Sequence, residues 1–505
     1  MKRSRSASRN IPKTKSENLS VVAKTIVNKL KNEVYAKPSE VVMRKPKVSK
    51  KYLDDFSLIS SRTIDLAKQV VQKDPYESLK DEINDPVFIE RICHNIRLFI
   101  EEKRRRYRSK IRDIENVLEQ LKRQMDELTE DQQKDDPSRH MLIVNIQLLG
   151  RLQELVRIAD VYSGIFFDEP KSISKDIKEQ AMFVRGLFKG KTVEDNWHTF
   201  MKSRLQNILY SSTGFPLLQS DAHRPVRTAI ARLIKTLASN YKVFRTKYNN
   251  MVFMGPPGVG KTTVAKAVGS ILGQLLILFE NDVKVLTAAD FVAEFEGQTP
   301  AKVKSLLSNG LERVIFLDEA YALLKCPPGG GPRKDEAAGY GIEAVNEMVA
   351  FMSDYTGMYV LIVAGYEKPM RDCFLPSNEG FARRFDSSLR FNISEFSTED
   401  LLRVFDTMSE DVPFIEDEVA LIQNFIVKLK EAKLLPNSAA DIQALVDQLT
   451  TSIGQDSKGL FDKDPKTTNE KLVRLVYIQN GLDEYTKPRS KRTNLHLDPV
   501  EFMLD

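Results

Sequence analysis

A glycine-rich turn between an apolar segment and a helix-like segment constrains this chain more than any other feature. Residues 255–262 read GPPGVGKT and fit the pattern G-x-x-x-x-G-K-[ST]. The apolar run NMVFM lies directly before the turn, and TTVAKAVGSILG leads out of it. A strand that enters such a turn and a helix that leaves it predict a parallel α/β sheet with an anion-binding loop at one strand end.

The residue types of this turn suit the phosphates of a nucleotide. Glycines let backbone N–H groups converge on phosphate oxygens, and the following helix N-terminus adds about half a positive charge. Lys261 would bring a mobile charge to the β- and γ-phosphates, and the Thr262 hydroxyl would ligate Mg²⁺. We therefore predict ATP and Mg²⁺ as cofactors. The expected nucleotide-binding residues are Gly255, Pro256, Pro257, Gly258, Val259, Gly260, Lys261, Thr262, Thr263 and Asp318.

A second apolar segment ends in the carboxylates that such a turn requires. The run VIFL at residues 314–317 predicts a buried strand, and Asp318 and Glu319 follow it directly. We expect Asp318 to hold the metal, directly or through water. Glu319 would orient and deprotonate the attacking water, a role worth about 10²–10⁴ in rate. The alternative is that the two acids merely cap a strand.

Length and pattern indicate several domains. The chain has 505 residues, of which 42% are apolar, so a wholly disordered protein is excluded. Alternating strand and helix patterns predict an α/β core over residues 205–395. Helical patterns predict a lid over residues 396–485, and residues 486–505 form a C-terminal tail. The expected strands are residues 250–254, 275–280, 313–317, 358–363 and 388–392.

The region over residues 52–204 is predicted to be all helical. A stripe of apolar residues steps by four and three residues in turn, as in a coiled coil. A second apolar helix follows a polar stretch, which favours an antiparallel hairpin near residues 97–162; pairing with another subunit is the alternative. The first stripe is Tyr107, Ile111, Ile114, Leu118, Leu121, Met125 and Leu128, and the second helix carries Leu142, Leu149, Leu152 and Val156 on one face.

Basic residues concentrate in the N-terminal tail. Residues 1–51 hold 15 Lys or Arg and 3 Asp or Glu, a local net charge of +12 against +6 for the whole chain, which leaves −6 for the remainder. We expect a disordered tail that serves as a nuclear-import signal, a phosphorylatable patch, a nucleic-acid contact or a solubilising segment. The run KRRRYR at residues 103–108 could likewise contact nucleic acid or form a solvated helix face.

Cysteine usage and hydropathy bear on the compartment. Cys93, Cys326 and Cys373 form no C-x-x-C pair, so we expect neither a disulfide framework nor a structural zinc site. No run approaches the roughly 18 apolar residues of a membrane span, and the first residues lack the apolar stretch of a signal peptide. We expect a soluble intracellular protein, cytoplasmic or nuclear, without a membrane partner.

Several blocks outside the turn extend the pattern. They read EFEGQTPAKVK, VIFLDEAYAL, GYGIEAVNEM, VLIVAGYEKPM and NEGFARRF. Together with GPPGVGKTTVAKAVG they resemble the AAA+ ATPases of the CbbX/CfxQ group, which includes red-type Rubisco activase and relatives of stage V sporulation protein K. The resemblance covers residues 205–485. It implies a P-loop AAA+ core with a parallel sheet and a helical lid, ATP hydrolysis, and assembly of identical subunits into a hexameric ring.

The resemblance also assigns roles to single residues. Phe295 matches the aromatic of the first pore loop, which grips a threaded polypeptide, although a core phenylalanine on a loop is the alternative. Arg384 matches the arginine finger that completes the neighbouring subunit's site, with Arg383 as the competing candidate. The catalytic set is therefore Glu319, Arg384 and Lys261. The lid departs from the family, because Gln443 stands where the nucleotide-sensing arginine is expected.

Three functions follow from these features. The first is an ATP-hydrolysing AAA+ ring that remodels an unidentified protein client. The second is a nucleic-acid-directed AAA+ motor or loader recruited by the tail at residues 1–51. The third, motivated by Gln443, is a nucleotide-gated scaffold with low turnover. The identity of the client does not follow from the matching blocks.

Overall fold

A five-stranded parallel sheet carries the glycine-rich turn. Its strand order is β2-β3-β4-β1-β5, so that β1 lies between β4 and β5. Every residue of β1, β3 and β4 is buried, as in a parallel sheet covered on both faces. The predicted P-loop AAA+ α/β class is confirmed. The strands are β1 Asn250–Met254, β2 Val283–Leu286, β3 Val314–Leu317, β4 Val360–Gly365 and β5 Phe385–Asn392.

The structure is a computed structural model, and it describes only part of the chain. The chain divides into two compact units, Met1–Ser78 and Leu79–Asp505. The predicted basic tail at residues 1–51 lies outside the described residues. Described are residues 74–127, 137–166, 193–242, 249–293, 298–327, 336–454, 461 and 468–493.

One strand prediction is wrong. Residues 275–279 are buried but turn back on the preceding helix, where the N–H groups of Ile277 and Leu278 both donate to the Leu272 carbonyl. The second strand instead begins at Val283, and its Val285 is 46% exposed. Because β2 is an edge strand with mixed exposure, its sequence carries a weaker apolar signal than the buried turn before it.

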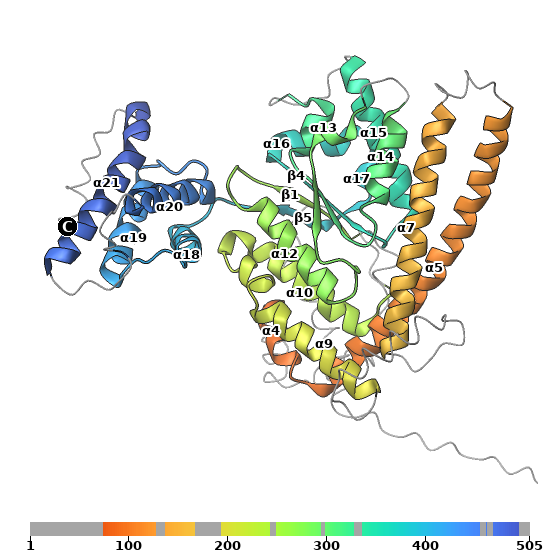
Figure 1. Ribbon diagram of the computed structural model, residues 1–505, viewed down its shortest axis with the longest axis horizontal. Helices are drawn as coiled ribbons and strands as arrows, with labels where there is room; N and C mark the ends of the chain where they lie inside the picture. The colour runs from red at the N-terminus through yellow and green to blue at the C-terminus, as the bar shows by residue number, and fades with distance from the viewer. Residues whose placement is uncertain are drawn as a thin grey trace, which may run out of the picture. The chain divides into compact units, whose positions relative to one another are not determined.

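Helices cover the sheet and form the lid (Figure 1). Lid helix α18 begins at Thr398, directly after Ser397, which forms a capping box with Asp400. The helices around the sheet are α10 Arg224–Ser239, α12 Lys261–Gln274, α13 Ala288–Phe291, α14 Thr299–Ser308, α15 Glu336–Asp354, α16 Glu367–Pro369 and α17 Glu379–Ala382, with short turns η1 Phe215–Leu218, η2 Asp221–His223, η3 Ala320–Leu324, η4 Met370–Phe374 and η5 Leu375–Ser377. The lid contains α18 Thr398–Met408, α19 Glu416–Glu431, α20 Ala439–Ile453 and α21 Thr468–Thr493.

Two long helices lie side by side and antiparallel ahead of the sheet in sequence (Figure 1, orange). They are α5 Pro86–Asp126 and α7 Pro137–Phe166; α4 Pro75–Glu82 precedes them and α9 Val193–Tyr210 follows. On α5 the predicted stripe is largely the buried face. On α7 the most buried positions are shifted from the predicted face. The buried residues are Tyr107, Ile114, Leu118 and Met125 on α5, and Val144, Leu148, Leu152, Leu155 and Ala159 on α7.

The basic run at residues 103–108 is built into the fold. Lys103 is 1% exposed, and its ammonium bonds the carboxylate of Glu312 and the carbonyl of Ile277. Glu312 also accepts a hydrogen bond from the Tyr107 hydroxyl. Burial lowers the pKa of Lys103 and raises that of Glu312, while their mutual attraction opposes both shifts.

The arginines of the run have partners as well. Arg104 and Arg108 pair with Asp160 on α7, and Arg106 donates to the Thr356 carbonyl at 2.6 Å. The run therefore joins α5 to α7 and to the sheet domain. Lys103 and Arg104 are largely buried in these contacts. Arg105 and Arg108 are 72% and 44% exposed, so a nucleic-acid contact through this run stays a prediction.

The cysteine prediction also needs correction. Cys326 and Cys373 form a disulfide with 5.9 Å between their Cα atoms, although 47 positions separate them in sequence. Spacing rules detect only cysteines that are close in sequence, whereas this pair meets through packing of the segments after β3 and β4. Among the helices that the structure describes, none is both long enough and apolar enough to cross a bilayer.

Candidate active site

The glycine-rich turn is held between two strand ends. The N–H of Gly255 donates to the Gly365 carbonyl at the end of β4, at 3.2 Å. On the other side, the N–H of Ile393 donates to the Met254 carbonyl at 2.7 Å. A Cβ atom at Gly255 would overlap the carbonyl oxygen of Ile393, so only glycine fits at this position. The turn thus leaves the middle of the sheet, where ligands of parallel sheets bind.

The far end of the turn opens helix α12. Gly260 precedes the helix with φ 77°, and Gly258 has φ 73°, a left-handed conformation that favours glycine. The first helical hydrogen bond runs from the N–H of Val264 to the carbonyl of Gly260 at 2.8 Å. The N–H groups of the first turn, which include Thr262 and Thr263, point along the helix axis toward an anion site. This cradle fits nucleotide phosphates.

The Lys261 side chain is hydrogen-bonded to the backbone of the turn. Its ammonium donates to the carbonyls of Gly255 and Pro256, at 3.0 and 2.8 Å. The side chain is 8% exposed, and burial lowers its pKa, although Asp318 and Glu319 favour its charged form. The lysine is therefore a buried cation whose hydrogen bonds can be exchanged for phosphate oxygens.

The predicted carboxylates lie at the end of β3, next to this lysine. The N–H of Asp318 donates to the Leu286 carbonyl of β2 at 2.9 Å, and the Asp318 carboxylate accepts from the N–H of Glu319 at 3.0 Å. Glu319 adopts φ 47°, which is strained for a residue other than glycine. Burial raises the pKa of Glu319, and the charge of Asp318 raises it further, against the attraction of Lys261.

A pair of tyrosines flanks the lysine and was not predicted as part of the site. The rings of Tyr321 and Tyr366 stack with 5.7 Å between centroids. The Tyr366 ring centroid lies 5.8 Å from the Lys261 ammonium. A Cβ atom on Gly365 would lie 2.7 Å from the Tyr321 ring, so the glycine of AGY is required by the tyrosine of DEAY. The signal in the sequence was the co-occurrence of these two blocks.

His223 supports the turn from η2 and was also missed. Its Nε2 donates to the Val259 carbonyl at 2.8 Å, and the ring packs edge-on against Phe396 at 5.3 Å. The side chain is 4% exposed, and burial lowers its pKa, so the neutral ring is favoured. A single histidine 36 residues before its partner carries no local signal.

The lid touches the turn directly. The N–H of Ala439 donates to the Gly258 carbonyl at 3.1 Å. A second contact of the lid involves α18, whose Asp400 carboxylate accepts from the N–H of Asp221 in η2 at 3.2 Å. Gln443, at the expected sensor position, is exposed and donates to Asp447 on its own helix at 2.8 Å.

The two candidate finger arginines differ in their surroundings. Arg384 donates to the Gly380 carbonyl at 2.6 Å and also bonds Ser353 on α15. Arg383 is far more exposed: 79% of its side chain is accessible, and it pairs with Glu379 at 3.0 Å. Both lie at the start of β5, beside the end of α17.

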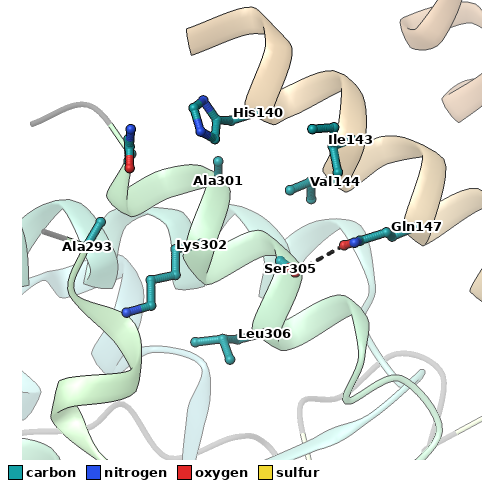
Figure 2. A pocket seen from close by; sticks show the side chains of 10 residues that line it. His140, Ile143, Val144, Gln147, Ala293, Ala301, Lys302, Ser305 and Leu306 are labelled. Atoms are coloured by element: carbon teal, nitrogen blue, oxygen red, sulfur yellow. Dashed lines mark hydrogen bonds between the residues drawn. The ribbon is translucent and has the colours of Figure 1, made fainter. Parts of the chain in front are cut away.

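Phe295, the expected pore-loop aromatic, lies outside the described residues. A groove of about 460 Å³ lies between α7 and α14, and Ala293 and Gln298 contribute to its wall (Figure 2). Ser305 on α14 donates to Gln147 on α7 at 3.3 Å across the groove, and Lys302 donates to the Val292 carbonyl at 2.7 Å.

Comparison with known proteins gives a family for the sheet domain. Residues 251–393 match the family described as "ATPase family associated with various cellular activities (AAA)". The chain is 34% identical to Protein CfxQ homolog of Trieres chinensis over 199 residues, which are 39% of this chain and 64% of that protein.

Two mycobacterial relatives also match part of the chain. ESX-1 secretion system protein EccA1 of Mycobacterium tuberculosis is 36% identical over 183 residues, which are 36% of this chain and 30% of that protein. ESX-3 secretion system protein EccA3 of Mycolicibacterium smegmatis is 36% identical over 162 residues, 32% of this chain and 25% of that protein. The matched part thus spans less than two thirds of each of these relatives.

Proposed function

We propose that this chain, which carries an AAA ATPase domain, binds ATP with Mg²⁺ at the glycine-rich turn and hydrolyses it with Glu319 as the base. The observation that carries the proposal is the convergence of a buried lysine and two strand-end carboxylates beside a turn with backbone N–H groups. Lys261, Asp318 and Glu319 interact electrostatically across the ends of the sheet.

Each residue of the site has a separate role in the proposed hydrolysis. Lys261 would leave the carbonyls of Gly255 and Pro256 and bind the β- and γ-phosphates. Thr262 and Asp318 offer the hydroxyl and the carboxylate that would hold Mg²⁺, which would neutralise charge on the phosphates. Glu319 would accept a proton from the attacking water, and its raised pKa makes it a stronger base than an exposed glutamate. The bond from the γ-phosphorus to the bridging oxygen then breaks, giving ADP and phosphate.

A substitution of the base tests this assignment. We expect Glu319→Gln to bind ATP but to release phosphate about 10²–10⁴ times more slowly. Glu399→Gln is the matched control, because Glu399 lies on the lid surface with 81% of its side chain exposed. Equal phosphate release from wild type and Glu319→Gln would remove Glu319 as the base.

We further propose a homo-oligomeric ring, six-membered as the resemblance implies, in which Arg384 completes the neighbouring site. Arg383 is the competing finger, because its guanidinium is exposed whereas that of Arg384 bonds Gly380 and Ser353. Separate Arg383→Ala and Arg384→Ala variants decide between them. The variant that lacks the finger should lose about 10³-fold in turnover while still binding ATP. The other variant should keep the turnover of the wild type.

The partner of the ring is proposed to be a protein rather than a nucleic acid. Two relatives carry names of secretion system proteins, and the predicted pore loop has an aromatic between two glutamates. The basic run at residues 103–108 is partly buried and bonded to α7 and to the sheet domain, which weakens one of the two supports for a nucleic-acid motor. Binding to DNA and RNA across a salt series, with and without residues 1–51, tests that alternative.

A further inference from the structure

The Cys326–Cys373 disulfide lies at the end of the segment that begins at Glu319, the proposed catalytic base. Cys326 follows η3, which begins directly after Glu319, and Cys373 lies in η4, after the segment that carries Tyr366. The bond therefore connects the segments that leave β3 and β4. These two segments also carry the stacked Tyr321 and Tyr366 rings next to Lys261.

The segment that the disulfide anchors is strained at both ends. Glu319 has φ 47° at the start of η3, and Lys325 has φ 49° at its end. Residues other than glycine adopt such φ angles only where the surrounding structure holds the backbone in place. Cys326 directly follows Lys325, and its N–H donates to the Tyr321 carbonyl at 3.2 Å. The disulfide thus fixes the far end of the strained segment whose near end is Glu319.

The two sulfurs differ in access. Cys326 is 8% exposed, whereas Cys373 is 1% exposed. Both residues are buried, and Cys326 is the more accessible of the two, so we take its sulfur as the one that an incoming thiolate attacks. Cys93 lies outside the disulfide, is buried, and sits near the Trp197 carbonyl, far from this pair in sequence.

We propose that Cys326 and Cys373 form a thiol–disulfide site that controls the nucleotide site, with the oxidised form the more active one. The effect on turnover rests on the proposed ATP hydrolysis. In the disulfide form the bond holds the end of the η3 segment in place. Glu319 then keeps its strained backbone conformation and its position relative to Lys261 and Asp318. In the dithiol form the segment can relax, and the carboxylate loses its fixed position relative to Lys261 and Asp318.

The exchange is a two-electron step with glutathione as the co-reactant. A glutathione thiolate attacks Cys326 Sγ, the Cys326–Cys373 bond breaks, and Cys373 leaves as a thiolate that takes up a proton. A second glutathione thiolate attacks the mixed disulfide, which releases Cys326 as a thiol and forms oxidised glutathione. Oxidised glutathione drives the same steps in reverse.

The test uses the purified full chain in glutathione buffers of increasing reduced fraction. Mass spectrometry after thiol labelling reports the disulfide, and phosphate release reports turnover. We expect reduction of wild type to lower turnover about fivefold, in step with loss of the disulfide. Cys326→Ser and Cys373→Ser should show the low rate in every buffer, and Cys93→Ala should respond like wild type. The deciding comparison is between oxidised and reduced wild type, which interconvert reversibly. The proposal can therefore be tested even if a cysteine variant fails to fold.

A second readout does not need turnover. If the two sites are coupled, binding of a non-hydrolysable ATP analogue must shift the glutathione ratio at which half of the disulfide is reduced. A shift without any phosphate release would support the thiol–disulfide site and contradict the proposed hydrolysis. Full labelling of both cysteines in oxidised buffer would overturn the proposal. A disulfide whose reduction changes neither turnover nor the analogue-dependent ratio would overturn it equally.

Discussion

The N–H of Ala439, at the start of lid helix α20, donates to the carbonyl of Gly258 in the phosphate-binding turn at 3.1 Å. The residue before Ala439, Ser438, adopts φ 47° and is 2% exposed. Lid and turn therefore share a backbone contact with no intervening side chain. We expect a nucleotide that displaces the turn to displace the start of α20 as well, so that the lid responds to ATP.

Replacing Gly258 tests this contact. A Cβ atom there would overlap the carbonyl oxygen of Asn437, and φ 73° disfavours alanine. We expect Gly258→Ala to weaken ATP binding more than about 100-fold, by displacing the lid and distorting the turn. Calorimetric titration with ATP measures the change. Gly150→Ala on α7 is the control, since its Cβ would meet nothing within 4 Å, and unchanged affinity in both variants would contradict the prediction.

The pH dependence of turnover should reflect Glu319. Its pKa is raised above 4.5 by burial and by Asp318, and a general base works only when deprotonated. As pH falls through the raised pKa, turnover should decline, so the acidic limb should lie above pH 4.5. Phosphate release across pH at ATP concentrations well below KM gives the profile, because kcat/KM reports the ionisation of the protein before ATP binds. An acidic limb at or below the ordinary glutamate range would mean that another group controls it.

Removing Lys103 should destabilise the junction of α5 with the sheet domain. Lys103→Met would leave the carboxylate of Glu312, which is 0% exposed, buried without its cation, at a cost of about 3–5 kcal/mol. The double variant Lys103→Met with Glu312→Gln should recover part of this loss. Urea unfolding followed by circular dichroism measures it.

Arg105→Met is the matched control for that experiment. Arg105 is 72% exposed and pairs with the nearby Glu102 on the surface of the same helix, so its loss should cost less than about 1 kcal/mol. Similar unfolding midpoints for Lys103→Met and Arg105→Met would show that the buried pair contributes little.

His223 should affect the affinity for ATP but not the rate of the hydrolysis step. Its Nε2 holds the Val259 carbonyl, so His223→Ala should loosen the turn and weaken ATP binding about tenfold, the equivalent of about 1.4 kcal/mol. The rate at saturating ATP should change less. Steady-state kinetics separate the two effects. His94→Ala, at an exposed position on α5, is the control, and a loss confined to turnover would refute the positioning role.

Much of the site could be predicted because its signals are local. The turn at residues 255–262 needs glycines where φ is positive, and a buried strand before it needs apolar residues, so both requirements appear in adjacent letters. The same holds for Asp318 and Glu319, which directly follow β3. Residues 275–280 misled the prediction, because a buried turn and a buried strand share the same apolar composition.

The sequence by itself determined the α/β class, the phosphate-binding turn and the acid pair, since each is encoded by neighbouring residues and the backbone geometry they favour. Only the tertiary structure decided which distant groups meet: His223 with Val259, Lys103 with Glu312, and Cys326 with Cys373. Those pairings depend on which helix and strand faces pack together. Packing of that kind is set by the shape and burial of whole elements, and it leaves no fixed spacing in the chain.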